Sequence, residues 1–192
     1  MKLNLKAKET EARIEDAFWQ VLDEKGLERL TVTDIIKVAN INRSTFYNYF
    51  PDKYELLGHL QDQLIDGIKQ ITNEKAIVTS QSPEEICTML NSYFINLLTY
   101  VKNNAKHILI MYDHDQETLF VSRIHYFSKE FFPYWAKLLH ENSEIKAQYA
   151  YAGIMGMIAS IVLEWFDSDF SLSVEEVAAI ANDVVQKFIF QR

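Results

Sequence analysis

Residues 30–57 read LTVTDIIKVANINRSTFYNYFPDKYELL, and they begin with a short helical pattern. The pattern runs from Val32 to Ala39 and follows Thr31, whose hydroxyl can cap the free backbone N–H groups of a helix start. Asp34 stands three residues after Thr31, as a short variant of the capping box. The stretch therefore predicts a helix of about eight residues with a defined first turn.

A turn and a second short helix follow. Residues 40–42 read Asn-Ile-Asn, and Asn is the non-glycine residue that best tolerates the left-handed conformation of a tight turn. The next helix is predicted from about Arg43 to Tyr49, and Pro51 stops it. A helix, a three-residue turn and a short second helix with small or polar leading residues form the layout of a helix-turn-helix.

The leading positions of the second helix decide what it can read. Side chains there must be short enough for the backbone to approach DNA, yet able to hydrogen-bond to base edges. Arg43, Ser44 and Thr45 meet that requirement, and Asn48 can reach a base edge or a phosphate. We therefore expect this helix to contact double-stranded DNA.

Over roughly residues 10–57 the chain resembles the signature of the TetR family of DNA-binding regulators. The resemblance rests on the helix-turn-helix, on the run Thr-Phe-Tyr-x-Tyr-Phe at residues 45–50, and on Lys53 three residues further on. It implies base contacts from four residues: Arg43, Ser44, Thr45 and Asn48. It implies that phosphates are held by Tyr47, Tyr49 and Lys53, and Thr33 completes the expected DNA-binding set.

Several of these residues have another interpretation. Phe46 and Phe50 are expected in the core, because a three-helix module needs apolar anchors beneath its recognition helix. Tyr47 and Tyr49 could be ordinary surface aromatics, although two exposed tyrosines on so short a helix favour a phosphate partner. For Lys53 the physics agrees with the resemblance, since the positive dipole end of a helix start already favours an anion.

Composition favours an all-α protein of two parts. The chain has 192 residues, of which 48% are hydrophobic, with five glycines, three prolines and a net charge of −8. Residues 1–53 contain nine Lys/Arg and nine Asp/Glu, so the acidic excess lies entirely in the remainder. We predict a three-helix, helix-turn-helix DNA-binding domain over residues 1–52, and a larger helical effector-binding and dimerisation domain over residues 53–192.

Other helices are predicted from periodicity and from start and stop signals. The first helix should run from Lys8 to Lys25, with Gly26 as its stop. A long amphipathic helix from Asp52 to about Asn73 should link the two domains. The segments predicted after Pro83 are 84–102, 104–113, 117–140, 144–166, and 173–190, the last of which starts with a capping box.

The run GIMGMIASIVLEWFDSDFSLSVEEVAAIA, residues 153–181, is similar to the end of the ligand domain in one TetR subgroup, which implies dimerisation. Independently, small residues fall on one helical stripe here, which another helix can approach closely or which packs within the chain itself. Together with the apolar side of the last helix, the stripe predicts a four-helix, two-fold interface. The expected interface residues are Gly153, Gly156, Met157, Ser160, Ile180 and Val184.

Aromatic side chains are dense in the middle of the chain, and most must belong to the core. A cavity for a small, partly apolar effector is the sharper interpretation, since such sites are lined by aromatic residues with a few polar groups. The expected lining residues are Tyr93, Met111, Tyr126, Trp135 and Met155.

Other kinds of site have weaker support. The acidic segment 112–117, with His107 and His125 nearby, contains metal-ligand residue types, but it is typical of a solvated helix end. Cys87, the single cysteine, is expected to be a small buried apolar residue. No phosphate loop, nucleophile elbow or zinc-hydrolase motif is present, so no cofactor, metal or catalysis is expected. A small helical enzyme and an interaction protein that no longer binds DNA stay open as alternatives.

The longest apolar stretch, Ile154 to Leu163, is far shorter than the roughly 20 residues that a membrane span requires. The charged N-terminal residues do not read as an export signal, so we expect a cytoplasmic protein. The expected function is that of a transcriptional repressor, which binds a palindromic operator as a homodimer and is released by a small-molecule effector. An activator or co-activator of the same family is the alternative.

Overall fold

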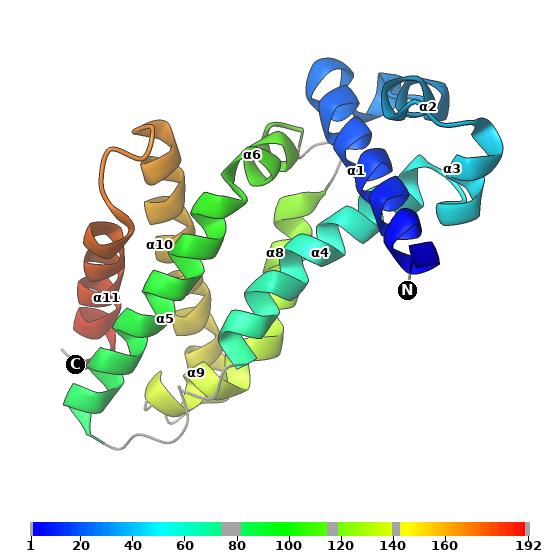
Figure 1. Cartoon of the computed structure of the whole chain (residues 1–192). Helices are drawn as coiled ribbons and strands as arrows, with labels where there is room; N and C mark the ends of the chain where they lie inside the picture. The colour runs from blue at the N-terminus through cyan, green and yellow to red at the C-terminus, as the bar shows by residue number, and fades with distance from the viewer. Residues whose placement is uncertain (1, 74–81, 115–118, 140–142, 191–192) are drawn as a thin grey trace. The chain divides into compact units, whose positions relative to one another are not determined.

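The computed structural model describes residues 2–73, 82–114, 119–139 and 143–190, and these residues form helices and no strand (Figure 1). The all-α class expected from composition is therefore confirmed. The chain divides into two compact units. The first contains Met1–Ile65 with Lys106–Arg123, and the second contains Asp66–Ala105 with Ile124–Arg192. The first unit thus extends beyond residue 52, where the sequence suggested a domain boundary.

The first unit begins with α1 (Lys2–Arg29), α2 (Val32–Ala39), α3 (Arg43–Tyr49) and the start of α4 (Lys53–Asn73). α1 starts before the predicted Lys8, and its helical backbone is interrupted at Gly26, where φ is 72° and ψ is 163°. Residues with a Cβ rarely adopt this φ, so a glycine is required for the bend. α2 and α3 have the bounds that their patterns predicted.

The ends of α2 have the geometry that the sequence indicated. The Thr31 hydroxyl accepts a hydrogen bond from the N–H of Asp34 at 3.2 Å, and the Asp34 carboxylate accepts one from the N–H of Thr31 at 3.1 Å. The capping box is therefore present. Asn40 adopts the left-handed conformation, with φ 50° and ψ 53°, and ends α2.

An apolar core lies beneath α3. Phe46 has no exposed surface and Phe50 is 6% exposed, as expected for the anchors of this helix. Burying such a side chain contributes about 1.5–3 kcal/mol to folding. The fully buried side chains of this core come from α1, the α1–α2 connection, α2 and α4, and include Ile14, Phe18, Leu22, Leu30, Ile35 and Leu56. α6 (Ala105–Asp113) lies in the same unit from Lys106 onward.

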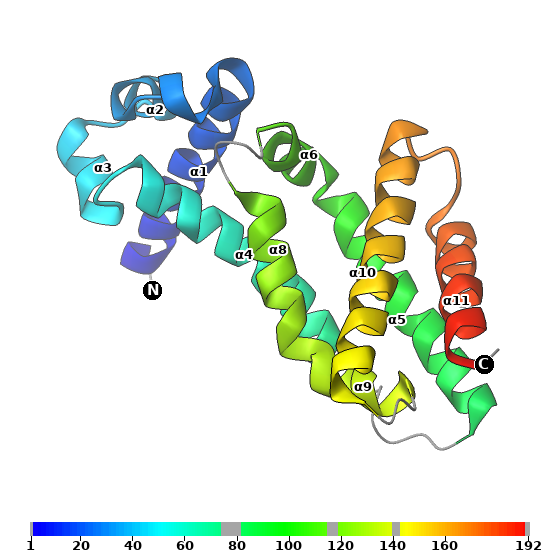
Figure 2. The same cartoon turned by 180° about the vertical axis from the view of Figure 1, so that it is seen from behind.

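The second unit is built around long helices. α5 (Pro83–Asn103), α10 (Glu144–Asp167) and α11 (Val174–Phe190) run side by side, and α11 packs along α5 (Figures 1 and 2). Ser173 and Glu176 form the predicted capping box at the start of α11, with hydrogen bonds of 2.8 and 3.2 Å. The buried face of α11 consists of Val177, Ala178, Ala181, Val185 and Ile189.

The prediction of one helix over residues 117–140 is wrong. α8 runs over Phe120–Ser128, a 3-10 turn η1 follows at Lys129–Phe131, and α9 runs over Phe132–Leu139. Residues 115–118 and 140 lie outside the described part of the chain. Pro133 explains the break, because it has no N–H to continue the helical bonds and its ring clashes with the carbonyl of the preceding turn. At the second position of α9 the missing N–H costs nothing.

Candidate DNA-binding site and its supporting contacts

α3 turns one polar face outward. Arg43, Ser44 and Asn48 are exposed and Tyr47 is 43% exposed, whereas Phe46 lies in the core. Arg43 donates a hydrogen bond to the Tyr47 hydroxyl at 3.1 Å, and its guanidinium lies 5.4 Å from the centroid of the Tyr47 ring. Three of the four residues expected to meet bases therefore share an exposed surface with Tyr47, one of those expected to meet phosphate, and the fourth, Thr45, is half-buried.

Asn42 organises the start of α3. Its side-chain oxygen accepts a hydrogen bond from the backbone N–H of Thr45 at 2.8 Å, which makes Asn42 the N-cap. The same oxygen accepts from the hydroxyls of Ser44 at 2.7 Å and Thr45 at 2.8 Å. The sequence pattern indicated that Asn42 belongs to the turn, but it did not indicate that Asn42 also binds the hydroxyls of Ser44 and Thr45.

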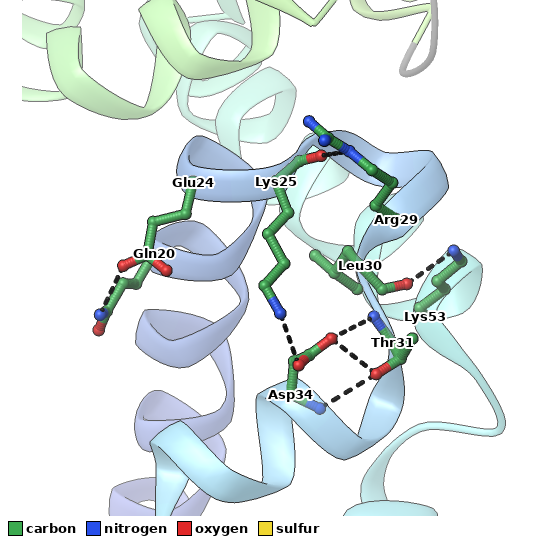
Figure 3. A network of polar contacts seen from close by, with 8 residues as sticks. All are labelled: Gln20, Glu24, Lys25, Arg29, Leu30, Thr31, Asp34 and Lys53. Carbon is green, nitrogen blue, oxygen red and sulfur yellow. Dashed lines mark hydrogen bonds and ion pairs between the residues drawn. The ribbon is translucent and has the colours of Figure 1, made fainter.

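Lys53 has partners inside the first unit. It is half-buried, and its ammonium donates to the backbone carbonyl oxygens of Leu27 and Leu30, both at 2.8 Å, and of Glu28 at 3.4 Å (Figure 3). These oxygens lie at the end of α1 and, for Leu30, directly after it, where helix carbonyl groups lack intrahelical partners. Lys53 therefore caps α1, and its contact with phosphate stays a prediction.

Two further contacts hold α1 against the helix-turn-helix. The Tyr49 hydroxyl donates to the backbone oxygen of Ala7 at 3.1 Å and ties the end of α3 to α1. Arg13 of α1 donates to the backbone oxygens of Ala39 and Asn40, the latter at 2.8 Å. A cation is favourable there, because the negative end of the α2 dipole lies at these residues. Sequence patterns miss Arg13, since its partners are 26 and 27 residues away.

Asp34 links α2 to α1. Its carboxylate lies 2.7 Å from the Lys25 ammonium and also accepts a hydrogen bond from the Thr31 hydroxyl at 2.7 Å (Figure 3). These hydrogen bonds, first that of Lys25 and then that of Thr31, lower the pKa of Asp34 to about 2. Thr33, the expected DNA contact on α2, is exposed next to this group.

A polar cluster joins α1 to α4. His59 Nε2 lies 3.0 Å from Glu15 Oε1 and 4.0 Å from Glu11 Oε1, and the Gln63 amide nitrogen lies 2.9 Å from both His59 Nε2 and Glu15 Oε1. These side chains of α1 and α4 are therefore polar partners of one another. The ring of His107, which lies near the segment 112–117 considered as a metal site, stacks on Trp19 with centroids 4.4 Å apart.

The five expected effector-lining residues are divided between the two compact units. Met111 is fully buried in the first unit. In the second unit, the rings of Tyr93 and Trp135 meet with centroids 6.5 Å apart. Tyr126 is 72% exposed and Met155 is half-buried.

The rings of Tyr93 and Trp135 belong to an aromatic cluster that includes Tyr151, 6.2 Å from Trp135. The Tyr151 hydroxyl donates to the Ser128 backbone oxygen at 2.6 Å. Burial raises the pKa of both Tyr93 and Tyr151, although hydrogen bonds with Thr72 and Ser128 oppose the shift. The cluster therefore carries neutral hydroxyls among apolar rings, and Tyr151 is a member that the sequence did not single out.

α10 exposes an apolar stripe. Gly153, Gly156 and Ser160 are exposed, and a Cβ added at either glycine would meet no atom of the described residues within 4 Å. On the same helix, Ile145 is 66% exposed and Tyr149 is 78% exposed. The small-residue stripe therefore does not pack within the described part of the chain. The other expected interface residues are exposed or half-buried: Met157, Ile180 and Val184.

α10 also has the length and apolar composition of a membrane-crossing helix, with a mean hydropathy of 1.4 and 28% of its most apolar window buried. The core helices of soluble proteins share this length and composition, but they are mostly buried. An apolar helix with a large exposed face is equally typical of a protein–protein interface.

Two family models match the chain. One, described as bacterial regulatory proteins of the tetR family, matches residues 14–60. The other, described as a transcriptional regulator C-terminal region, matches residues 88–187, which is more than half of the chain. A search of curated proteins found no match.

Solved structures show the same fold. A TetR transcriptional regulator from Streptococcus agalactiae 2603V is 22% identical, with 96% of this chain and 98% of that chain covered and a TM-score of 0.65. A regulator of the TerR/AcrR family from Aquifex aeolicus VF5 is 18% identical, with 92% and 98% covered and a TM-score of 0.66. The dihydroxyacetone kinase operon activator DhaS is 19% identical, with 94% and 96% covered and a TM-score of 0.54.

Proposed function

The chain belongs to the TetR family of bacterial transcriptional regulators, and we propose that it is a repressor that binds a palindromic operator as a homodimer. The observation that carries the proposal is the exposed polar face of α3, anchored by Phe46 and capped at its start by Asn42. Base contacts are assigned to Arg43, Ser44, Thr45 and Asn48. Backbone contacts are assigned to Tyr47, Tyr49 and Lys53, with Thr33 at the edge of the same surface.

Gel shifts on random duplexes at rising salt test whether the protein binds DNA at all. Affinity should fall steeply with salt, because bound Lys and Arg side chains release counterions from phosphates. Affinity that is absent, or that does not change with salt, would contradict the proposal and favour a protein that has lost DNA binding.

The dimer is proposed to form through α10 and α11, with the stripe around Gly156 facing its copy. Support comes from the open space over both glycines and from the exposed apolar side chains beside them. The two recognition helices would then enter successive major grooves, about 34–36 Å apart. Light scattering at micromolar concentration tests the stoichiometry, and a strict monomer, both free and on DNA, would contradict it.

The effector is proposed to be a small, partly apolar molecule that binds in the second unit at the aromatic cluster of Tyr93 and Trp135. Aromatic rings with a few hydroxyls are typical linings of such sites. α4 contributes residues to both units, and a tilt of α4 on effector binding would change the separation of the recognition helices. A hundredfold loss of operator affinity requires about 2.7 kcal/mol of coupling. The protein is proposed to act in the cytoplasm.

A thermal-shift screen of metabolites and of aromatic or cationic drugs would supply effector candidates. Each candidate is then titrated with and without operator, and operator should weaken its binding by the same factor by which it weakens operator binding. Equal affinities in the two titrations would contradict this mechanism. Replacing Trp135 by Ala should abolish binding, whereas the matched change at exposed Tyr126 should not.

An activator is the second candidate. It is favoured by the name of one structural neighbour, the operon activator DhaS, whose fold is shared over 94% of this chain. A reporter placed under the selected operator separates the two candidates, because a repressor lowers its transcription and an activator raises it.

A further inference from the structure

The orientation of the Asn42 amide is fixed by the backbone. The N–H of Thr45 can only donate, so the Asn42 atom that lies 2.8 Å from it must be the carbonyl oxygen and not the amide nitrogen. This oxygen carries no hydrogen. Every group that bonds to it must therefore act as a donor.

Two hydroxyls bond to that oxygen. Ser44 Oγ lies 2.7 Å from Asn42 Oδ1, and Thr45 Oγ1 lies 2.8 Å from it. A hydroxyl has a single hydrogen and two lone pairs. The Asn42 oxygen shares its two lone pairs among three donors, the Thr45 N–H and the two hydroxyls. With their hydrogens directed at this oxygen, Ser44 and Thr45 offer their own lone pairs to any further partner.

We propose that Asn42 fixes the base preference of α3, by holding Ser44 and Thr45 as hydrogen-bond acceptors that read the exocyclic amino groups of adenine or cytosine. In the major groove, adenine presents its N6 amino group and cytosine its N4 amino group, whereas guanine presents N7 and O6 and thymine presents O4, all acceptors. The inference rests on the proposed role of α3 as recognition helix. Asn42 is then a positioning residue, since it acts through the two hydroxyls.

The same polarity excludes other uses of these hydroxyls. Phosphate oxygens are acceptors, so Ser44 and Thr45 cannot bind the DNA backbone through their hydroxyls while the Asn42 contacts persist. Arg43, directly before them, has donors alone and suits guanine. We therefore expect guanine where Arg43 meets a base, and adenine or cytosine where Ser44 or Thr45 meets one.

Selection from random duplexes, followed by affinity measurements on all four base pairs at each position, tests the proposal. Positions that respond to Ser44→Ala or Thr45→Val should prefer adenine or cytosine on the contacted strand over guanine or thymine by about tenfold, the worth of one hydrogen bond that leaves its partners unsatisfied when lost. Replacing the preferred base by an analogue that lacks its exocyclic amino group should lose the same factor with the wild-type protein.

Two substitutions at residue 42 form a matched pair. Asn42→Asp keeps the acceptor, so it should keep the preference while weakening all DNA binding through repulsion of phosphate. Asn42→Gly removes the acceptor but weakens the helix cap by only a few tenths of a kcal/mol, so the preference should fall toward equality. Circular dichroism melts show whether both variants fold. The base-analogue experiment uses the wild-type protein and so does not depend on either variant.

The outcomes separate this inference from the proposed function. If no sequence is enriched from the random pool, α3 is not a sequence-specific reader and both fail. If an operator is enriched, the inference alone fails when its Ser44- or Thr45-dependent positions prefer guanine or thymine, when the base analogues bind equally well, or when neither hydroxyl substitution changes any position. A folded Asn42→Gly variant that keeps the full preference would also overturn it.

Discussion

The exposed faces of α3 and α10 differ in how far their side chains are already engaged. On α3, Ser44 and Thr45 bond to Asn42, and Arg43 lies on Tyr47. On α10, the stripe at Gly153 and Gly156 meets open space, with Tyr149 exposed beside it. The α3 face is polar and its groups are pre-ordered. The α10 face is apolar and has no packing partner within the described chain.

This difference indicates two kinds of partner. Pre-ordered polar groups suit reversible recognition of polar base edges, because little side-chain entropy is lost on binding. An apolar stripe with small residues suits lasting burial against another helix, since the hydrophobic effect favours its removal from water. One surface is thus suited to exchange between DNA sites and the other to a permanent contact.

The largest expected effect follows from Gly156→Glu on α10. Open space around Gly156 means that the monomer accommodates the new side chain, whereas an interface would bury an unpaired charge. The dimer dissociation constant should rise on the order of 100-fold or more. Analytical ultracentrifugation measures it, with Asn96→Glu at an exposed site of α5 as the matched control. An unchanged dimer would place the interface elsewhere.

Lys53→Ala tests how much the contacts of Lys53 stabilise the first unit. Loss of its contacts with the carbonyl groups at the end of α1 should lower the free energy of unfolding of that unit by about 1.5–3 kcal/mol. Urea denaturation measures the change, and Lys37→Ala at an exposed site on α2 is the control. Wild-type stability of the variant would contradict this role of Lys53 in the fold. The phosphate contact proposed for Lys53 requires, in addition, that the salt dependence of DNA binding falls by about one phosphate contact in the variant.

Arg43→Ala tests the reading face itself. It should reduce discrimination at one operator position by about tenfold, within the usual 1–3 kcal/mol of a base contact, and leave binding to random DNA less affected. Fluorescence anisotropy on matched and mismatched duplexes gives both numbers. Equal losses on the two duplexes would show that Arg43 holds phosphate.

The smallest effect concerns acid stability through Asp34. Its pKa of about 2 in the folded protein lies below the ordinary value, so the stabilisation that it provides is present above about pH 4 and is lost as the pH falls toward 2. Asp34→Asn should therefore lose less stability than the wild type between these limits. Thermal melts at pH 5 and pH 2.5 provide the comparison, and parallel losses in the two proteins would contradict the assignment.

Local chemistry explains which parts of the fold could be predicted. The capping box of Thr31 and Asp34, the left-handed Asn40 and the bounds of α2 and α3 depend on neighbouring residues, so short patterns indicate them. The break at η1 was also local, but its signal was one residue, Pro133, within an otherwise helical run.

Contacts between distant residues explain what the sequence left out. Lys53 lies 23 to 26 residues from the carbonyl groups that it caps, and no periodicity reports such a pairing. Met111 was grouped with Tyr93 and Trp135 by residue type, but Met111 belongs to the first compact unit and the two aromatic residues belong to the second. The roles of individual DNA-facing residues stay predictions, because shape and exposure show that a side chain can reach DNA and not what it meets there.

Whether α3 reads DNA is tested by titration of the wild-type protein against its selected operator and a scrambled duplex, at salt concentrations from about 50 to 200 mM. We expect two chains per operator, an affinity for the operator about 1,000-fold or more above that for the scrambled duplex, and a linear fall of log affinity with log salt. Equal affinity for the two duplexes, or binding that ignores salt, would contradict the assignment of α3 as the DNA-reading element.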